Sequence, residues 1–269
     1  MLTKLHDDDP TFEKIFHLTP MEISKLFSIP LEKSQQIYEK IHSSTLKKLV
    51  IYDQKRTKVL TRFDKQFPSQ LMHIPDPPFV LYCQGNIQLL HEKRMISVIG
   101  TRKPSDEAFN KLQHIVIPLI ENDWTIVSGL AYGIDSLAHR LTIAHNGKAI
   151  AILGSGFQHV YPKENFPLFQ QIAKRGLVIS EYPPEQVPRK FHFPERNRLI
   201  SGISKGTLVI EATEKSGTLI TVDQALEQGK EVYAVPGSPW LKQTVGCHKL
   251  IQDGAKLVID AKDIFADFK

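Results

Sequence analysis

The segment from Ile96 to Gly129, "ISVIGTRKPSDEAFNKLQHIVIPLIENDWTIVSG", decides the fold class. It begins with the apolar run "ISVIG", continues through a longer segment with apolar residues at helical spacing, and ends in a second apolar run, "WTIVSG". Neither run alternates apolar with polar residues, and continuous runs of this kind are typical of strands buried on both faces of a sheet. The segment therefore predicts a strand, a helix and a second, parallel strand.

The same unit recurs along the rest of the chain. Further apolar runs begin at Lys148, Gly176, Gly206, Glu231 and Ala255 ("KAIAILG", "GLVIS", "GTLVIEA", "EVYAVPG" and "AKLVI"). Helix-like segments such as "DSLAHRLTIAHNG" and "VDQALEQGK" lie between them, and several end in Gly or Asn-Gly, as helix C-caps do. Strands and helices in alternation predict an α/β fold with a doubly wound, mostly parallel sheet.

The first part of the chain has a different pattern. Short helical patterns such as "EKIFHL", "EISKLF" and "QQIYEKI" are separated by proline and turn residues, so we expect a small all-α domain over residues 1–55. Residues 56–269 form the predicted α/β domain. It begins with "TRFDKQFPSQLMHIPDPPFVLYCQGN", whose prolines indicate extended backbone and whose aromatic and aliphatic residues predict docking on a neighbour.

Composition limits the class of protein. The 269 residues are 41% hydrophobic and 23% charged, and a formal charge of +5 suits a polyanionic partner without requiring one. The two cysteines, Cys83 and Cys247, have neither disulfide-framework nor zinc-ligand spacing. The sequence contains neither a signal-peptide pattern nor an apolar run long enough for a membrane span, so we expect a cytoplasmic protein without membrane insertion.

Small and polar residues follow nearly every predicted strand, in the turns "GTRKPS", "SGLAYGID", "GSGFQHVYPKEN", "SEYPPE", "EATEKSGT" and "PGSP". In a doubly wound sheet these turns share the carboxyl edge, where such folds bind ligands. Glycine lets backbone N–H groups approach an anion, and the N-terminus of the next helix adds partial positive charge. The edge is therefore expected to bind an anionic ligand.

Known nucleotide motifs do not match this edge. "GSGFQHV" has His159 where a dinucleotide fingerprint has its third glycine, and the sequence contains no P-loop. Tyr132, Asp135 and His139 do not form a catalytic triad in our interpretation, since Asp135 is expected to cap a helix and His139 to pack on the sheet or face solvent. We therefore expect no catalytic residue, no metal and no cofactor.

The segment "PRKFHFPERNR" points to single-stranded nucleic acid. It places Arg189, Lys190, Arg196 and Arg198 beside two phenylalanines and a histidine, and it holds one carboxylate. Binding of a single strand needs cations along its backbone and aromatic faces on which its bases stack. The structural alternative stays open here: one phenylalanine anchors the loop and the arginines pair with carboxylates such as Glu211.

The joined motifs resemble those of the DprA/Smf family of DNA-processing proteins. "VIGTRKPS", "IVSGLAYGIDSLAHR", "AILGSGFQHVYPKEN", "ISEYPPE", "FPERNRLISGISKGTLVIEA", "SGTLITVDQALEQGKEVYAVPG" and "GCHKLIQDGA" occur in the family's order and spacing, over nearly everything after residue 60. The resemblance implies an extended Rossmann-like fold preceded by a small SAM-like or helix-hairpin-helix-like domain. It also implies a homodimer without an enzymatic step that protects incoming single-stranded DNA and loads the recombinase RecA onto it in natural transformation, with single-strand-binding protein as a further partner.

The resemblance also implies which residues contact DNA. Phe191 or Phe193 would supply the face on which a base stacks. Contacts with the phosphates and the backbone are expected at Arg102, Ser128, Gly129, Gly154, Ser155, Gly156, Lys163, Asn165, Lys190, Arg196, Asn197, Arg198, Ser216, Gly217 and Thr218. For Arg102 the alternative is a plain surface residue, and for Ser128 and Ser216 it is helix capping.

The chain departs from the family's pattern in two places. Its first part lacks the glycine-bearing hairpin of helix-hairpin-helix modules, and it ends at "DAKDIFADFK", so we expect a short form without a C-terminal winged-helix domain. The competing hypothesis is a phosphoribohydrolase-like enzyme that releases nucleobases, because "EKSGTLIT" is similar to the loop of those enzymes. Thr221 stands where their glutamate would supply acid–base chemistry, which counts against this alternative.

Overall fold

A computed structural model describes residues 2–268, and its contacts divide the chain into two compact units, with the boundary in the sequence between Arg56 and Thr57. The first unit is helical. A capping box starts one of its helices, since the Thr19 hydroxyl accepts from the Glu22 N–H while the Glu22 carboxylate accepts from the Thr19 N–H at 2.8 Å. Its helices are α1 (Leu2–Asp8), η1 (Lys14–His17), α2 (Pro20–Phe27), α3 (Leu31–Ile41) and α4 (Ser44–Arg56).

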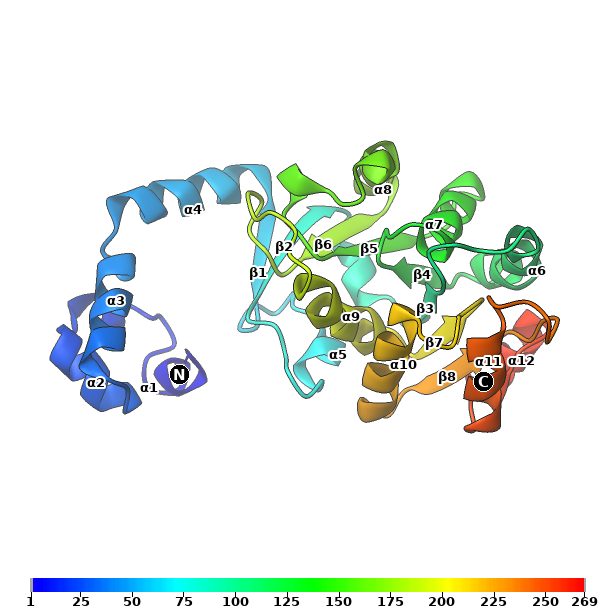
Figure 1. Cartoon of the computed structure of the whole chain (residues 1–269). Helices are drawn as coiled ribbons and strands as arrows, with labels where there is room; N and C mark the ends of the chain where they lie inside the picture. Colours follow the sequence, from blue (N-terminus) through cyan, green and yellow to red (C-terminus); the bar gives the residue numbers. More distant parts are fainter. Residues whose placement is uncertain (1, 269) are drawn as a thin grey trace. The chain divides into compact units, whose positions relative to one another are not determined.

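The second unit contains a nine-stranded sheet in the order β1-β2-β6-β5-β4-β3-β7-β8-β9 (Figure 1). The strands are β1 (Lys58–Thr61), β2 (Val80–Gly85), β3 (Met95–Ile99), β4 (Thr125–Ser128), β5 (Ala149–Leu153), β6 (Leu177–Ser180), β7 (Gly206–Val209), β8 (Glu231–Ala234) and β9 (Lys256–Leu257). The pairs β1–β2 and β2–β6 are antiparallel, and the remaining pairs are parallel. The predicted doubly wound, mostly parallel α/β fold is confirmed.

Helices cover both faces of the sheet. They are α5 (Ser69–Met72), η2 (Ile87–His91), α6 (Ala108–Glu121), α7 (Ile134–Ala144), η3 (Phe157–His159), η4 (Lys163–Asn165), α8 (Phe166–Arg175), α9 (His192–Ile203), α10 (Gly217–Glu227), α11 (Val245–Gln252), α12 (Ala261–Phe265) and η5 (Ala266–Phe268). Side chains of β3 alternate between the two layers: Met95 and Ile99 join the core with α9, whereas Ile96 and Val98 join the core with α6.

Every residue of β3 to β6 is buried, which explains why these runs are apolar on both faces.

The order in which the chain adds strands to the sheet determines where a ligand site can lie. From β3 the chain winds outward through β4, β5 and β6, and α9 then returns it to β7, on the other side of β3. The carboxyl ends of β3 and β7 therefore meet at a topological switch point, the usual ligand-binding position in such sheets.

Candidate nucleic-acid interface

A cavity of about 940 Å³ lies at this switch point. Its lining includes Ile99 to Lys103, which follow β3, and Thr213 with Lys215 to Thr218, which follow β7. The lining also includes residues from α9, from the β8–α11 loop and from the turns that follow β4, β5 and β6. The cavity thus lies at the edge where the sequence predicts an anionic ligand.

The lining is strongly cationic. It contains seven cationic side chains, those of Arg102, Lys103, Arg189, Lys190, Arg196, Lys215 and Lys242. Asp135 is the one carboxylate among the lining residues, which gives a formal charge of +6. The whole chain carries +5, so all residues outside the lining sum to −1. Positive charge is therefore concentrated at this cavity rather than spread over the protein.

Three helices begin at the cavity and add partial positive charge there. Residues of their first turns or of the turns before them line it: Asp135 for α7, Lys190 and Phe193 for α9, and Ser216 for α10. Ser216 is the N-cap of α10, and its hydroxyl accepts from the Thr218 N–H at 3.2 Å. Ser216 thus caps its helix, which is the alternative given above for this residue, and it also lines the cavity.

The turn between β3 and α6 presents two cations to the cavity, Arg102 and Lys103, both exposed. The buried carboxylate of Glu211, two residues after the end of β7, holds this turn in place. It accepts from the Ser105 N–H at 2.8 Å and from the Ser105 hydroxyl at 2.5 Å. Lys111 of α6 pairs with the same carboxylate at 2.9 Å. Neither Arg102 nor Lys103 has a side-chain hydrogen bond or ion pair among the described residues, so both are available to a ligand.

Arg196 lies in the cavity wall rather than on the surface. Its Nη1 donates to the carbonyls of Gly129, at 2.6 Å, and Ile152, and its Nε donates to Asn197 Oδ1 at 3.1 Å. Burial lowers its pKa to about 10, against the opposing effect of the Asp135 carboxylate. Burial likewise raises the pKa of Asp135, and the Arg196 charge opposes that shift. Nη2 makes no hydrogen bond within the described residues, so this end of the guanidinium can serve an anion in the cavity.

Aromatic rings stand beside these cations. Phe193 and Tyr161 both line the cavity, and their ring centroids lie 5.5 Å apart. Phe191 is 53% exposed and lies outside the lining, where its ring meets His192 edge-on. Of the two phenylalanines predicted as stacking faces, Phe193 is the one that the fold places in the cavity. Tyr161, which was not among the predicted stacking faces, is a second ring in the same wall.

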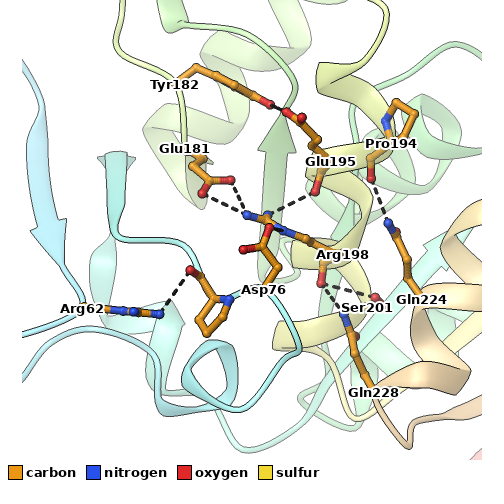
Figure 2. Close-up of polar contacts among 11 residues, drawn as sticks. Arg62, Asp76, Glu181, Tyr182, Pro194, Glu195, Arg198, Ser201, Gln224 and Gln228 are labelled. Atoms are coloured by element: carbon orange, nitrogen blue, oxygen red, sulfur yellow. Dashed lines mark hydrogen bonds and ion pairs between the residues drawn. The ribbon is translucent and has the colours of Figure 1, made fainter. Parts of the chain in front are cut away.

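Arg198 has a different environment from Arg196, two residues away. Its guanidinium lies among carboxylates (Figure 2). A Glu181 carboxylate oxygen is 2.8 Å from Nη2, and an Asp76 carboxylate oxygen is 3.0 Å from Nε. Burial raises the pKa of Glu181, and the neighbouring Arg198 opposes that shift. Tyr182 donates to Glu195 at 2.7 Å in the same cluster. Arg198 lies outside the cavity lining, and its charge is satisfied by protein carboxylates, as the structural alternative proposed for this segment.

The turn after β5 is filled by protein. The Gly156 N–H donates to the Gln186 carbonyl at 2.8 Å, and the Ser155 hydroxyl donates to the His159 carbonyl at 2.8 Å. A Cβ placed on Gly154 would come within 3.0 Å of the Phe193 ring. Phosphate contacts were predicted at these three residues, but the Gly156 amide is already bonded within the protein. The small size of the three residues lets the segment before α9 pack closely against this turn.

Four further predicted residues lie away from the lining. The Ser128 hydroxyl donates to the Val98 carbonyl at 2.7 Å, and the Gly129 N–H donates to Asp135 Oδ2 at 3.1 Å. Asn165 is buried and donates to the Leu130 carbonyl at 2.9 Å. These three residues hold the turn between β4 and α7. Lys163 is exposed at the start of η4, just before α8.

The fold thus brings together eight of the predicted site residues in the cavity: Arg102, Lys190, Phe193, Arg196, Asn197, Ser216, Gly217 and Thr218. Nine lie outside its lining: Ser128, Gly129, Gly154, Ser155, Gly156, Lys163, Asn165, Phe191 and Arg198. Sequence reasoning missed three of the lining cations, Lys103, Lys215 and Lys242, and it named Arg189 in the cationic segment without predicting a DNA contact for it. Each follows a strand in a turn at the carboxyl edge or adjoins the aromatic segment, and a rule that selects every cation in such turns would have found them.

Within residues 2–268, no cluster of three or more His, Cys, Asp or Glu side chains is arranged to hold a metal ion. Among the described helices, none is both long enough and apolar enough to span a bilayer.

Comparison with known proteins gives one consistent family. The sequence profile of "DNA recombination-mediator protein A" matches residues 58–269. DNA processing protein DprA of Bacillus subtilis is 45% identical over 81% of this chain and 74% of its own length, and protein Smf of Escherichia coli is 38% identical over 76% and 54%.

Two solved structures are also similar. The X-ray structure of DNA processing protein A from Streptococcus pneumoniae aligns over 100% of this chain and 92% of its own, with a TM-score of 0.88 and 36% identity. DNA processing protein A from Helicobacter pylori, whose structure describes a single-stranded DNA binding mode, aligns over 78% of this chain and 95% of its own, with a TM-score of 0.71 and 28% identity. The chain therefore belongs to the DprA/Smf family of DNA-processing proteins, the DNA recombination-mediator protein A family.

Proposed function

We propose that this chain binds single-stranded DNA in the cavity between β3, β7 and α9. The observation that carries the proposal is the concentration of charge, since the lining holds a formal +6 in a chain of +5. Phosphates of the strand lie against Arg102, Lys103, Lys215 and the N-termini of α9 and α10. Its bases stack near Phe193 and Tyr161, because a single strand exposes the base faces that a duplex hides.

Binding rather than catalysis suits the side chains of the cavity. A hydrolase needs a general acid or base within reach of its substrate. Asp135, the lining carboxylate, is held by the Gly129 N–H and faces the Arg196 charge. Glu211 is bonded to Ser105 and Lys111, and Glu181 to Arg198. Each candidate carboxylate thus already supports a cation or a turn. Release of a nucleobase from nucleoside monophosphates would contradict this part of the proposal.

The experiment that tests DNA binding is fluorescence anisotropy of labelled oligo-dT and a matched duplex. We expect a preference for the single strand that is lost in the double variant Arg102→Ala/Lys103→Ala. The matched control is Lys174→Ala/Arg175→Ala, which removes the same charge from exposed positions at the end of α8, outside the lining. Equal losses in both variants would indicate a general charge effect and contradict a site in the cavity.

We further propose that the chain acts as a homodimer in the cytoplasm, protects incoming single strands, and loads RecA onto them during natural transformation and recombination. The family membership supports this role, and two cavities on one strand would raise affinity through effective concentration. Sedimentation should show a dimer. RecA filaments should grow faster on strands covered by single-strand-binding protein when the chain is added. A monomer without effect on RecA assembly would contradict the role.

A further inference from the structure

The two tryptophans of the chain have opposite environments. Trp124 is 3% exposed and packs edge-on against Phe268 at 5.2 Å, in the core below α6 and α12. Trp240 is 91% exposed. A large aromatic side chain in water forgoes the stabilisation that burial gives, and tryptophan in such a position is enriched where a partner covers it. The exposure of Trp240 therefore needs an explanation outside the core.

The loop that carries Trp240 has a defined conformation. It joins β8 to α11, and hydrogen bonds close it at both ends. The Thr244 hydroxyl donates to the Ser238 carbonyl at 2.6 Å, and the Leu241 N–H donates to the same carbonyl at 3.1 Å. The Trp240 N–H itself donates to the Ser238 hydroxyl at 3.4 Å. These bonds place the indole on a closed turn, so little backbone entropy is lost when a ligand meets it.

The same loop reaches the cationic cavity. Lys242 and Gln243 belong to the lining, and residues two apart have Cα atoms at most about 7 Å apart. Trp240 therefore stands beside the cavity rim at Lys242. The chemistry repeats that of the cavity, which Phe193 and Tyr161 line together with Arg102 and Lys190.

We propose that Trp240 is a second stacking platform, which holds a base of the single strand after the strand leaves the cavity past Lys242. The inference rests on the proposed function and extends it, because it assigns the exit side of the strand and a contact outside the cavity. A nucleotide fits both neighbours, since its phosphate pairs with Lys242 and its base covers the indole. A protein partner would favour an apolar surround, whereas Lys242, Gln243 and Ser238 are polar.

The test uses the fluorescence of Trp240, because buried Trp124 supplies a constant background. Oligo-dT is titrated into the full chain at lengths from about 4 to about 16 nucleotides, the range of site sizes in single-strand-binding folds. We expect short strands to bind without quenching and longer strands to quench the exposed indole. Trp240→Ala should lower the affinity for long strands about fivefold, which corresponds to the lower end of the base-stacking energy, and leave the affinity for short strands unchanged. Trp240→Phe should restore most of the affinity.

A long oligonucleotide with abasic sites toward one end separates stacking from charge. It should bind the wild type as weakly as oligo-dT binds Trp240→Ala. Binding of long strands with no quenching and no effect of Trp240→Ala would overturn the inference and leave the cavity proposal intact. Absence of binding at every length, in anisotropy as in fluorescence, would overturn both. A change of sedimentation in Trp240→Ala, with abasic and normal strands bound equally, would assign the indole to a protein contact and overturn the inference.

Discussion

At the scale of single residues, Arg196 and Arg198 carry the same charge two positions apart in α9 and meet different partners. Both belong to "PERNR", and the pattern predicts the same task for both. The fold separates them, because Arg198 meets Glu181 and Asp76, which lie far away in sequence, while Arg196 enters the cavity wall. The positive charge at this edge of the sheet could be predicted from the sequence. The partners of each arginine could not, since they depend on which loops the sheet brings together.

His139 of α7 gives a prediction at the same scale. The sequence left open whether it packs on the sheet or faces solvent, and it is fully buried. Burial lowers its pKa to about 4 from 6.5. Between these pH values the unfolded chain binds a proton that the folded chain does not, so stability falls as pH drops through this window. The loss attributable to His139 should reach about 3 kcal/mol.

Urea unfolding of the wild type and of His139→Gln over a pH series measures this loss. The variant cannot titrate there, so the difference in unfolding free energy between the two proteins should shrink as pH falls from 6.5 to 4. Some slope should remain in the variant, because burial also lowers the pKa of His192. Parallel curves for the two proteins would show that His139 is protonated in the folded state and contradict the assignment.

At the scale of elements, the prediction was most accurate where burial is two-sided. All seven apolar runs from Ile96 onward are strands, within a few residues of their predicted ends. The segment from Thr61 to Asn86 was expected to be extended and docked on a neighbour, and its last part is the extended strand β2, which pairs antiparallel with β6. Its prolines obscured the strand, because they lie beside β2 rather than inside it. Sequence pattern thus identifies central strands better than the strands added at an edge.

The turn between β3 and α6 depends on a contact between elements, and this gives a second prediction. Glu211 is fully buried and pairs with Lys111, whose side chain is 14% exposed. Glu211→Gln removes the charge and keeps the shape, so Lys111 loses its main partner in a dry site. We expect unfolding free energy to fall by about 3 kcal/mol. Affinity for oligo-dT should also fall, because the turn that presents Arg102 loses its anchor.

The matched control is Glu107→Gln, since Glu107 is the other carboxylate near Lys111, at 3.6 Å, and is 59% exposed. An exposed pair of this kind contributes at most about 1 kcal/mol, so urea unfolding should distinguish the two variants clearly. Oligo-dT binding should be unchanged in Glu107→Gln. Similar unfolding midpoints for both variants would mean that the buried pair does not hold the turn.

At the scale of the whole molecule, the position of the site was predictable and its full composition was not. Parallel strands bring their carboxyl ends to one edge by topology alone, so motifs spread from Thr101 to Thr218 are expected to converge. Which side chains face outward depends on loop packing. The turn after β5 shows this, because residues 183–186 fill the space at Gly156, and Phe193 fills the space at Gly154, that a phosphate would need.

The last prediction concerns how salt acts on the whole protein. Each phosphate neutralised on a single strand contributes about −0.7 to the slope of log affinity against log salt. Seven cations line the cavity, so the slope for an oligo-dT that fills it should not exceed about −5 in magnitude. Arg102→Ala/Lys103→Ala should reduce the magnitude by about 1.4, and Lys174→Ala/Arg175→Ala should leave it unchanged. Because only the seven lining cations can meet phosphates in the cavity, a slope well beyond that limit would require contacts that the cavity does not supply. A slope near zero would mean that phosphates do not carry the binding, and the cationic cavity would lose its role.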